Sequence, residues 1–70
     1  MNATLQITVN GESRPAQDGA TVRDLLRELG LEGRRVAIER NLDILPHSRW
    51  AETRIAPGDR YEIVQFVGGG

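Results

Sequence analysis

The residues with the clearest chemical meaning are the last three, Gly68, Gly69 and Gly70. They follow directly on residues 60–67, the most strand-like run in the chain, where a turn and a returning segment are the usual pattern. Glycines have no side chain, so this segment offers only backbone amides and the terminal carboxylate of Gly70. Fully extended, three residues reach roughly 10 Å, which could carry that carboxylate into a narrow site on another protein. The alternative is a frayed terminus without function.

Few other residues suggest a reactive site. The chain has no cysteine, which excludes disulfides, zinc–thiolate sites, a catalytic thiol and a side-chain persulfide. His47 is the only histidine and has no carboxylate cluster beside it, so a solvated turn residue is a simpler interpretation than a ligand or base. The sequence contains no recognisable serine–histidine–acid arrangement and no glycine–lysine phosphate loop. We therefore expect no catalytic residue, no metal site and no cofactor bound by this chain.

The composition indicates one small globular domain. The chain has 70 residues, of which 39% are hydrophobic and 27% charged. Nine arginines are interspersed among ten acidic residues, giving a net charge of −1 without the basic stripe that nucleic-acid binding requires. No apolar run is long enough to cross a membrane, and residues 1–4 lack the features of a signal peptide. We expect a cytoplasmic protein with no nucleic-acid or membrane partner.

The N-terminal part of the chain predicts a β-hairpin. Residues 4–9 alternate between apolar and polar side chains, as in a half-buried strand. Asn10 and Gly11 suit a two-residue type I′ turn because both tolerate positive φ. Residues 12–16 should return antiparallel, and Pro15, which lacks an amide donor, assigns this second strand to a sheet edge.

An amphipathic helix should follow. Thr21 is a suitable N-cap, with Asp24 completing a capping box. The apolar stripe consists of Val22, Leu25, Leu26 and Leu29. Gly30 lies where a left-handed residue ends a helix, and Leu31 could pack back on the helix as in a Schellman ending.

The second half of the chain predicts three more strands: residues 34–39, the short run 44–45, and a last strand from Arg60. Residues 47–50 suggest a brief helical turn that places Trp50 at the end of the sheet.

One helix must then cover one face of one sheet, which is an α+β fold with a mixed sheet of about five strands. The first and last strands are the most apolar, so we expect them to lie side by side and parallel at the sheet centre. The predicted domain spans residues 1–67, and residues 68–70 form a flexible C-terminal tail.

The last strand has an unusual pattern. If Tyr61 and Ile63 point into the core, period-two alternation turns Val64 and Phe66 outward. Two apolar side chains on the solvated face suggest a patch for docking a partner. The alternative is a twist or bulge that buries one of them.

The order of elements resembles the ubiquitin-like β-grasp fold, and the chain is similar to the ThiS family, the sulfur carrier proteins of thiamine biosynthesis. The resemblance covers nearly the whole chain, including the hairpin at residues 10–11, the helix after Thr21 and the strand at residues 36–38. Its most specific parts are Pro46, Trp50-Ala51-Glu52-Thr53, Pro57-Gly58-Asp59-Arg60, Glu62-Ile63-Val64 and Phe66-Val67-Gly68-Gly69-Gly70. A terminal pair of glycines by itself is shared by many carriers.

The resemblance implies a sulfur donor that is not itself an enzyme. In similar proteins an E1-like adenylating enzyme of the ThiF type uses ATP and magnesium to activate the carboxylate that corresponds to Gly70. A persulfide derived from a cysteine desulfurase then displaces AMP and leaves a thiocarboxylate, which supplies sulfur to a thiazole synthase of the ThiG type. Gly68 and Gly69 would thread the partner's active site, and Val64 and Phe66 would dock on its surface.

Three alternatives remain open. The small subunit of molybdopterin synthase also uses a thiocarboxylate tail, and only the stretch around Trp50 favours thiamine. A carrier for cysteine synthesis or a protein-conjugating modifier is a second possibility. A β-grasp interaction module with an inert tail is the third.

Overall fold

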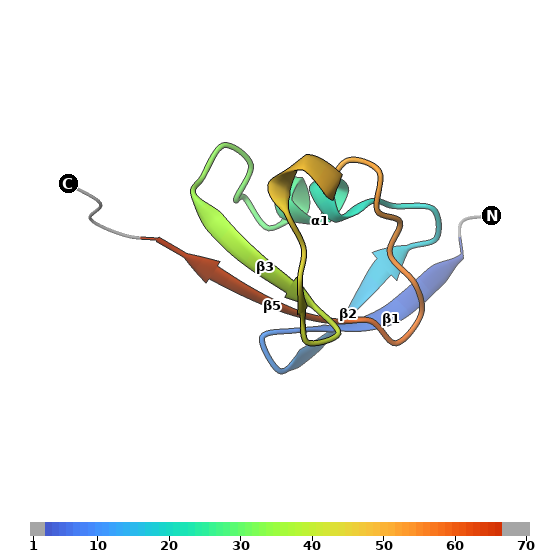
Figure 1. Cartoon of the computed structure of the whole chain (residues 1–70). Coiled ribbons are helices and arrows are strands. Elements are labelled where there is room, and N and C mark those ends of the chain that lie inside the picture. Colours follow the sequence, from blue (N-terminus) through green and yellow to red (C-terminus); the bar gives the residue numbers. More distant parts are fainter. Residues whose placement is uncertain (1–2, 67–70) are drawn as a thin grey trace.

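The computed structural model describes residues 3–66; residues 1–2 and 67–70 lie outside the described part. Helix α1 lies on one face of a single sheet (Figure 1). The strands are β1 (Thr4–Val9), β2 (Glu12–Gln17), β3 (Val36–Arg40), β4 (Asp43–Ile44) and β5 (Arg60–Gln65), and the helices are α1 (Val22–Glu28) and the 3₁₀ helix η1 (His47–Arg49). The predicted α+β fold with five strands is confirmed, whereas the predicted boundary after residue 67 falls outside the described residues.

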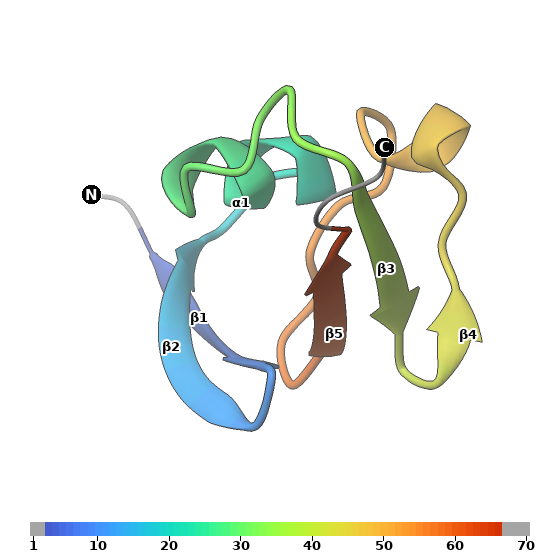
Figure 2. The ribbon, with the colours of Figure 1, turned by 90° about the vertical axis from the view of Figure 1, so that its left-hand side faces the viewer.

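The strand order is β2-β1-β5-β3-β4, and β5 lies between β1 and β3 (Figure 2). β1 and β5 are parallel, and the other neighbouring pairs are antiparallel. The predicted parallel central pair is therefore confirmed. The last strand is held on both sides, which fixes the point from which the C-terminal residues depart.

The first hairpin forms as predicted. Asn10 and Gly11 both have positive φ, 51° and 83°, and Val9 pairs directly with Glu12 across this two-residue turn. β2 is an edge strand, so Pro15 needs no hydrogen-bonding neighbour on its outer side.

Both ends of α1 are capped as the sequence predicts. Thr21 Oγ1 accepts from the Asp24 N–H at 3.2 Å, and the Asp24 carboxylate accepts from the Thr21 N–H at 2.9 Å. At the other end Gly30 has a φ of 76°, and the Leu31 N–H donates to the Leu26 carbonyl at 2.8 Å. This is the hydrogen-bond pattern of a Schellman motif.

Several predicted strand bounds differ from the structure by one or two residues: β2 ends at Gln17 instead of residue 16, and β3 ends at Arg40 instead of residue 39. β3 begins at Val36 instead of residue 34, and β4 covers Asp43–Ile44 instead of residues 44–45. The shift of β4 arises because the turn uses only Asn41 and Leu42, both at positive φ, so pairing resumes one residue earlier.

The core lies between α1 and the sheet. Trp50 is buried beside η1, and its indole N–H donates to the Leu45 carbonyl at 3.0 Å, so the polar end of this large side chain is satisfied. The buried apolar residues are Ile7, Val9, Ala16, Val22, Leu25, Leu26, Ile38, Trp50, Ile55, Tyr61 and Ile63. Among the described residues, no helix is long and apolar enough to span a membrane.

Candidate functional site

The end of β5 presents apolar side chains to solvent. Tyr61 and Ile63 are buried, whereas Val64 and Phe66 are each 59% exposed. The regular alternation excludes a bulge that buries either residue. The prediction that both point outward is confirmed; their docking role stays a prediction.

The exposed apolar surface extends beyond β5. Ala37 lies directly opposite Val64, and Ile44 of β4 lies opposite Glu39. Directly paired residues of antiparallel strands project to the same face, so these side chains share one face of the sheet. The helix α1 covers the opposite face (Figure 1). We call Ala37, Ile44, Val64 and Phe66 the open-face patch. Sequence analysis missed Ile44, which is 74% exposed, because its face depends on the register set by the β3–β4 turn.

A buried carboxylate anchors the start of β5. Asp59 is only 4% exposed. Its carboxylate accepts from Arg40 Nε at 3.0 Å, Asn41 Nδ2 at 3.0 Å, the Ala56 N–H at 2.9 Å and the Tyr61 hydroxyl at 2.7 Å. Sequence analysis did not identify Asp59 as a buried hydrogen-bond acceptor. The available signal was that aspartate side chains in turns often bond nearby backbone amides, as this one does with Ala56.

The same contacts shift two pKa values. Burial favours the neutral form of Asp59, but the hydrogen bonds from Ala56, Asn41, Tyr61 and Arg40 outweigh it and hold the pKa of this carboxyl below its usual value. Burial, followed by the hydrogen bond to Asp59, raises the pKa of the Tyr61 hydroxyl well above its usual range. Asp59 therefore stays ionised and Tyr61 neutral near pH 7, so the contact acts structurally rather than in proton transfer.

Two asparagines in the hairpin turns also hold β5. Asn10 Oδ1 accepts from the Ile63 N–H at 2.8 Å, and Asn10 Nδ2 donates to the Ile63 carbonyl at 3.2 Å. From the other side, Asn41 Oδ1 accepts from the Arg60 N–H at 2.9 Å. Each side chain substitutes for a neighbouring strand where the hairpin turns away. β5 is thus held on its β1 side as far as Ile63 and on its β3 side as far as Gln65.

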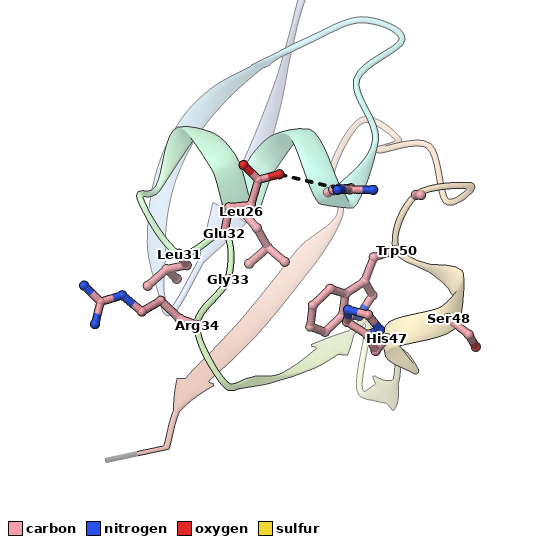
Figure 3. A pocket seen from close by; sticks show the side chains of 10 residues that line it. Leu26, Leu31, Glu32, Gly33, Arg34, His47, Ser48 and Trp50 are labelled. Atoms are coloured by element: carbon pink, nitrogen blue, oxygen red, sulfur yellow. Dashed lines mark ion pairs between the residues drawn. The ribbon is translucent and has the colours of Figure 1, made fainter. Parts of the chain in front are cut away.

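A separate open cavity of about 560 Å³ lies on the helix side, between α1 and η1 (Figure 3). Leu26, Leu31 and Trp50 supply apolar lining, and the Arg23–Glu32 ion pair at 3.5 Å crosses its rim. His47 is exposed, as predicted, and its ring meets that of Trp50 edge-on at a centroid distance of 4.5 Å. These contacts indicate a packing role for His47.

The predicted reactive residue Gly70, with Gly68 and Gly69, lies outside the described residues, which end at Phe66. Within residues 3–66, no three histidine or acidic side chains gather in a way that could hold a metal ion. The described residues thus end with a strand of the sheet whose outward side chains are charged at Arg60 and Glu62 and apolar at Val64 and Phe66.

Residues 7–70 match the model of the ThiS family. The chain belongs to this family. It is 43% identical over 54 residues to the sulfur carrier protein ThiS of Bacillus subtilis, covering 77% of this chain and 82% of that protein. The solved structure of the thiamine biosynthesis protein ThiS from Geobacter metallireducens has a TM-score of 0.74 and 33% identity, covering 94% of this chain and all of that one. The ThiS fold therefore accounts for the β-grasp arrangement observed here.

Larger relatives contain a segment like this ThiS family member. The chain is 47% identical over 66 residues to the thiazole synthase of Paramagnetospirillum magneticum and 35% identical to that of Magnetococcus marinus. In both cases the match covers 94% of this chain but only 20% of the relative. The chain thus spans about a fifth of the length of these two thiazole synthases.

Proposed function

We propose that this chain carries sulfur as a thiocarboxylate on Gly70 and donates it to thiazole formation in thiamine biosynthesis. The match of residues 7–70 to the ThiS family is the observation that carries the proposal, because it spans both the β-grasp domain and the terminal glycines. Relatives of similar length that bear the name sulfur carrier protein ThiS support it, as does the fixed strand that leads to the glycines.

The chemistry requires activation by a partner. The carboxylate of Gly70, with a reference pKa of about 3.3–3.7, is ionised at pH 7 and is a poor electrophile. An E1-like enzyme of the ThiF type would use ATP and magnesium to join the carboxylate to AMP and release pyrophosphate. The terminal sulfur of a persulfide would attack the acyl carbon and expel AMP, and a second thiol would cleave the S–S bond to leave the thiocarboxylate. The persulfide would come from a cysteine desulfurase.

In this scheme the chain is a co-substrate, consumed and recharged in each cycle, and it binds neither ATP nor magnesium itself. Gly68 and Gly69 would thread the partner's active site, while Val64 and Phe66 would dock the activating enzyme.

Residues 67–70 follow Phe66, and four residues span at most roughly 14 Å. Any enzyme that acts on Gly70 must therefore come close to the exposed end of β5. The cytoplasmic location expected from the sequence stays a prediction.

A thiazole synthase of the ThiG type is the proposed acceptor. The two thiazole synthases that contain a segment like this chain support the pairing, because joining two functions in one polypeptide keeps a donor beside its acceptor. The similarity to sulfur carrier proteins ThiS and to a thiamine biosynthesis protein favours this acceptor over molybdopterin synthase.

The test is the intact mass of the chain after incubation with a ThiF-type enzyme, ATP, magnesium and a cysteine desulfurase with cysteine. We expect a gain equal to one oxygen-to-sulfur exchange. Deletion of Gly70 should abolish the gain, and the matched surface variant Asp18→Asn should retain it. A mass gain only with a molybdopterin-type activating enzyme would indicate that the chain supplies sulfur for molybdopterin synthesis instead. No gain with either enzyme would contradict the carrier proposal and favour an interaction module with an inert tail.

A further inference from the structure

Two glutamates face each other on the open face of the sheet. Glu39 of β3 and Glu62 of β5 are directly paired, and both are exposed. Residues paired in this way have Cβ atoms about 4.5–5.5 Å apart, and like charges so placed destabilise the sheet. In the part of the chain that the structure describes, neither carboxylate forms an ion pair. Within the described residues, no ion pair therefore offsets the repulsion between these two carboxylates.

Apolar side chains flank the glutamate pair on two sides. Ile44 is directly opposite Glu39, so it extends the same row of side chains on one side. Ala37 and Val64 form the next row along the strands, followed by Phe66. The open-face patch would exclude water from a partner docked here, and an ion pair strengthens as water is excluded. A cation brought to Glu39 and Glu62 would thus be bound in a favourable environment.

We propose that thiazole synthase docks on this face and places an arginine or lysine of its own against both Glu39 and Glu62, with apolar side chains packed on the open-face patch. The identity of the partner rests on the proposed function. Three observations support this occupant: the unpaired double negative charge, the few residues between Phe66 and Gly70, and the thiazole synthases that contain a segment like this chain.

A second copy of the chain fits this face less well. It would bring its own Glu39 and Glu62 to the interface and add like charges to those already present. Arg60 is two residues from Glu62 on the same strand and therefore on the same face, but it forms no ion pair within residues 3–66. Self-association is accordingly an outcome that the test must detect.

The proposal predicts effects of opposite sign in two measurements. Replacing one glutamate by glutamine relieves the repulsion in the free chain, so the melting temperature of Glu39→Gln or Glu62→Gln should stay level or rise. The same change removes a charge that the synthase neutralises, so affinity should fall. A purely structural role for either residue would lower stability and affinity together.

The experiment is calorimetric titration of the full chain with the thiazole synthase of the same organism, at low and high salt. We expect the double variant Glu39→Gln/Glu62→Gln to bind at least about tenfold more weakly and to lose much of the salt dependence. Glu12→Gln is the control matched to each single variant, because it also removes one negative charge, from the exposed end of the β2 edge strand. Its affinity should equal that of the unmodified chain.

The outcomes separate the two proposals. Tenfold weaker binding of the double variant with an unchanged Glu12→Gln control supports the docking surface. Equal affinities of all variants for the synthase, with normal sulfur loading, would overturn the docking surface and leave the carrier function intact. An unmodified chain that is loaded with sulfur but only self-associates through this face would also overturn it. A chain that is neither loaded nor bound would contradict both proposals.

Discussion

The two ends of β5 reverse the usual distribution of polar and apolar groups. At its start, the carboxylate of Asp59 is buried and accepts four hydrogen bonds. At its end, Val64 and Phe66 are more than half exposed. A buried charge is tolerated only when its partners are in place, and an exposed apolar pair gains nothing until another surface covers it. The strand therefore separates a structural end from an end available to partners.

This separation has a mechanical consequence. Under the proposed function, the residues that follow β5 enter other enzymes and need a firmly held strand before them. Asn10 and Asn41 bond the backbone of β5 from opposite sides, and Asp59 ties its start to β3 through Arg40. Substitutions at the two ends should then affect different measurements, stability at the start and partner binding at the end.

The largest expected effect is at the structural end. Asp59→Ala leaves the Tyr61 hydroxyl, Arg40 and the Ala56 N–H without their acceptor, and a buried donor left unsatisfied costs about 1–3 kcal/mol. Urea unfolding should report this loss, and exposed Asp18→Ala is the control. A loss of unfolding free energy below about 0.5 kcal/mol, the range of ordinary surface substitutions, would show that Asp59 does not stabilise the start of β5.

The next effect is at the opposite end. Val64→Ala/Phe66→Ala should raise the KM of the activating enzyme for this chain about tenfold, because apolar contacts at an interface centre are typically worth 1 kcal/mol or more. The free energy of unfolding should change by less than about 0.5 kcal/mol. Leu42→Ala truncates another exposed apolar side chain away from β5 and is the control. An unchanged KM, or a large loss of stability, would show that the two ends do not divide these roles.

A smaller effect should appear on acidification. The folded-state pKa of Asp59 lies below its unfolded value near 3.8, so its ionisation contributes stability that is present above that value. The contribution is lost as the pH falls through the lower folded-state pKa. Asp59→Asn should flatten the fall of unfolding free energy below about pH 4.

The contribution of Asp24 must be separated from that of Asp59 in this experiment. The hydrogen bond from the Thr21 backbone N–H is the main cause that lowers the pKa of the Asp24 carboxyl, so Asp24 contributes in the same direction and pH range. Asp24→Asn should therefore remove only its own share of the pH dependence. If Asp59→Asn retained the full acid sensitivity of the unmodified chain, Asp59 would not be the main carboxylate that links stability to pH.

The elements that the sequence predicted well carry their signals locally. The capping box of Thr21 and Asp24 and the Gly30 ending lie within one helix, and the Asn10-Gly11 turn is set by two adjacent residues. The alternation that turns Val64 and Phe66 outward is also local, because it requires only that β5 remain regular. Such features do not depend on which segments meet in the fold.

The features that the sequence did not predict depend on contacts between distant segments. The acceptor role of Asp59 needs Arg40 and Asn41 from the β3–β4 hairpin, 19 and 18 residues away. The pairing of Glu39 with Glu62, and the exposure of Ile44 beside them, depend on strand register. The register between β3 and β4 also follows a turn whose second residue is leucine, where local preferences favour glycine.

The smallest expected effect concerns this turn. Leu42 has a φ of 76° and is 85% exposed, so its side chain gains little from packing while its backbone occupies a region unfavourable for residues with a Cβ. Leu42→Gly should raise the free energy of unfolding by up to about 1 kcal/mol, because the relief exceeds the extra flexibility that glycine gives the unfolded chain. Asn41→Gly, the matched change one residue earlier, should instead destabilise, because it removes the bonds to Arg60 and Asp59. If Leu42→Gly destabilised as much as Asn41→Gly, the leucine side chain would be part of the structural end of β5 despite its exposure.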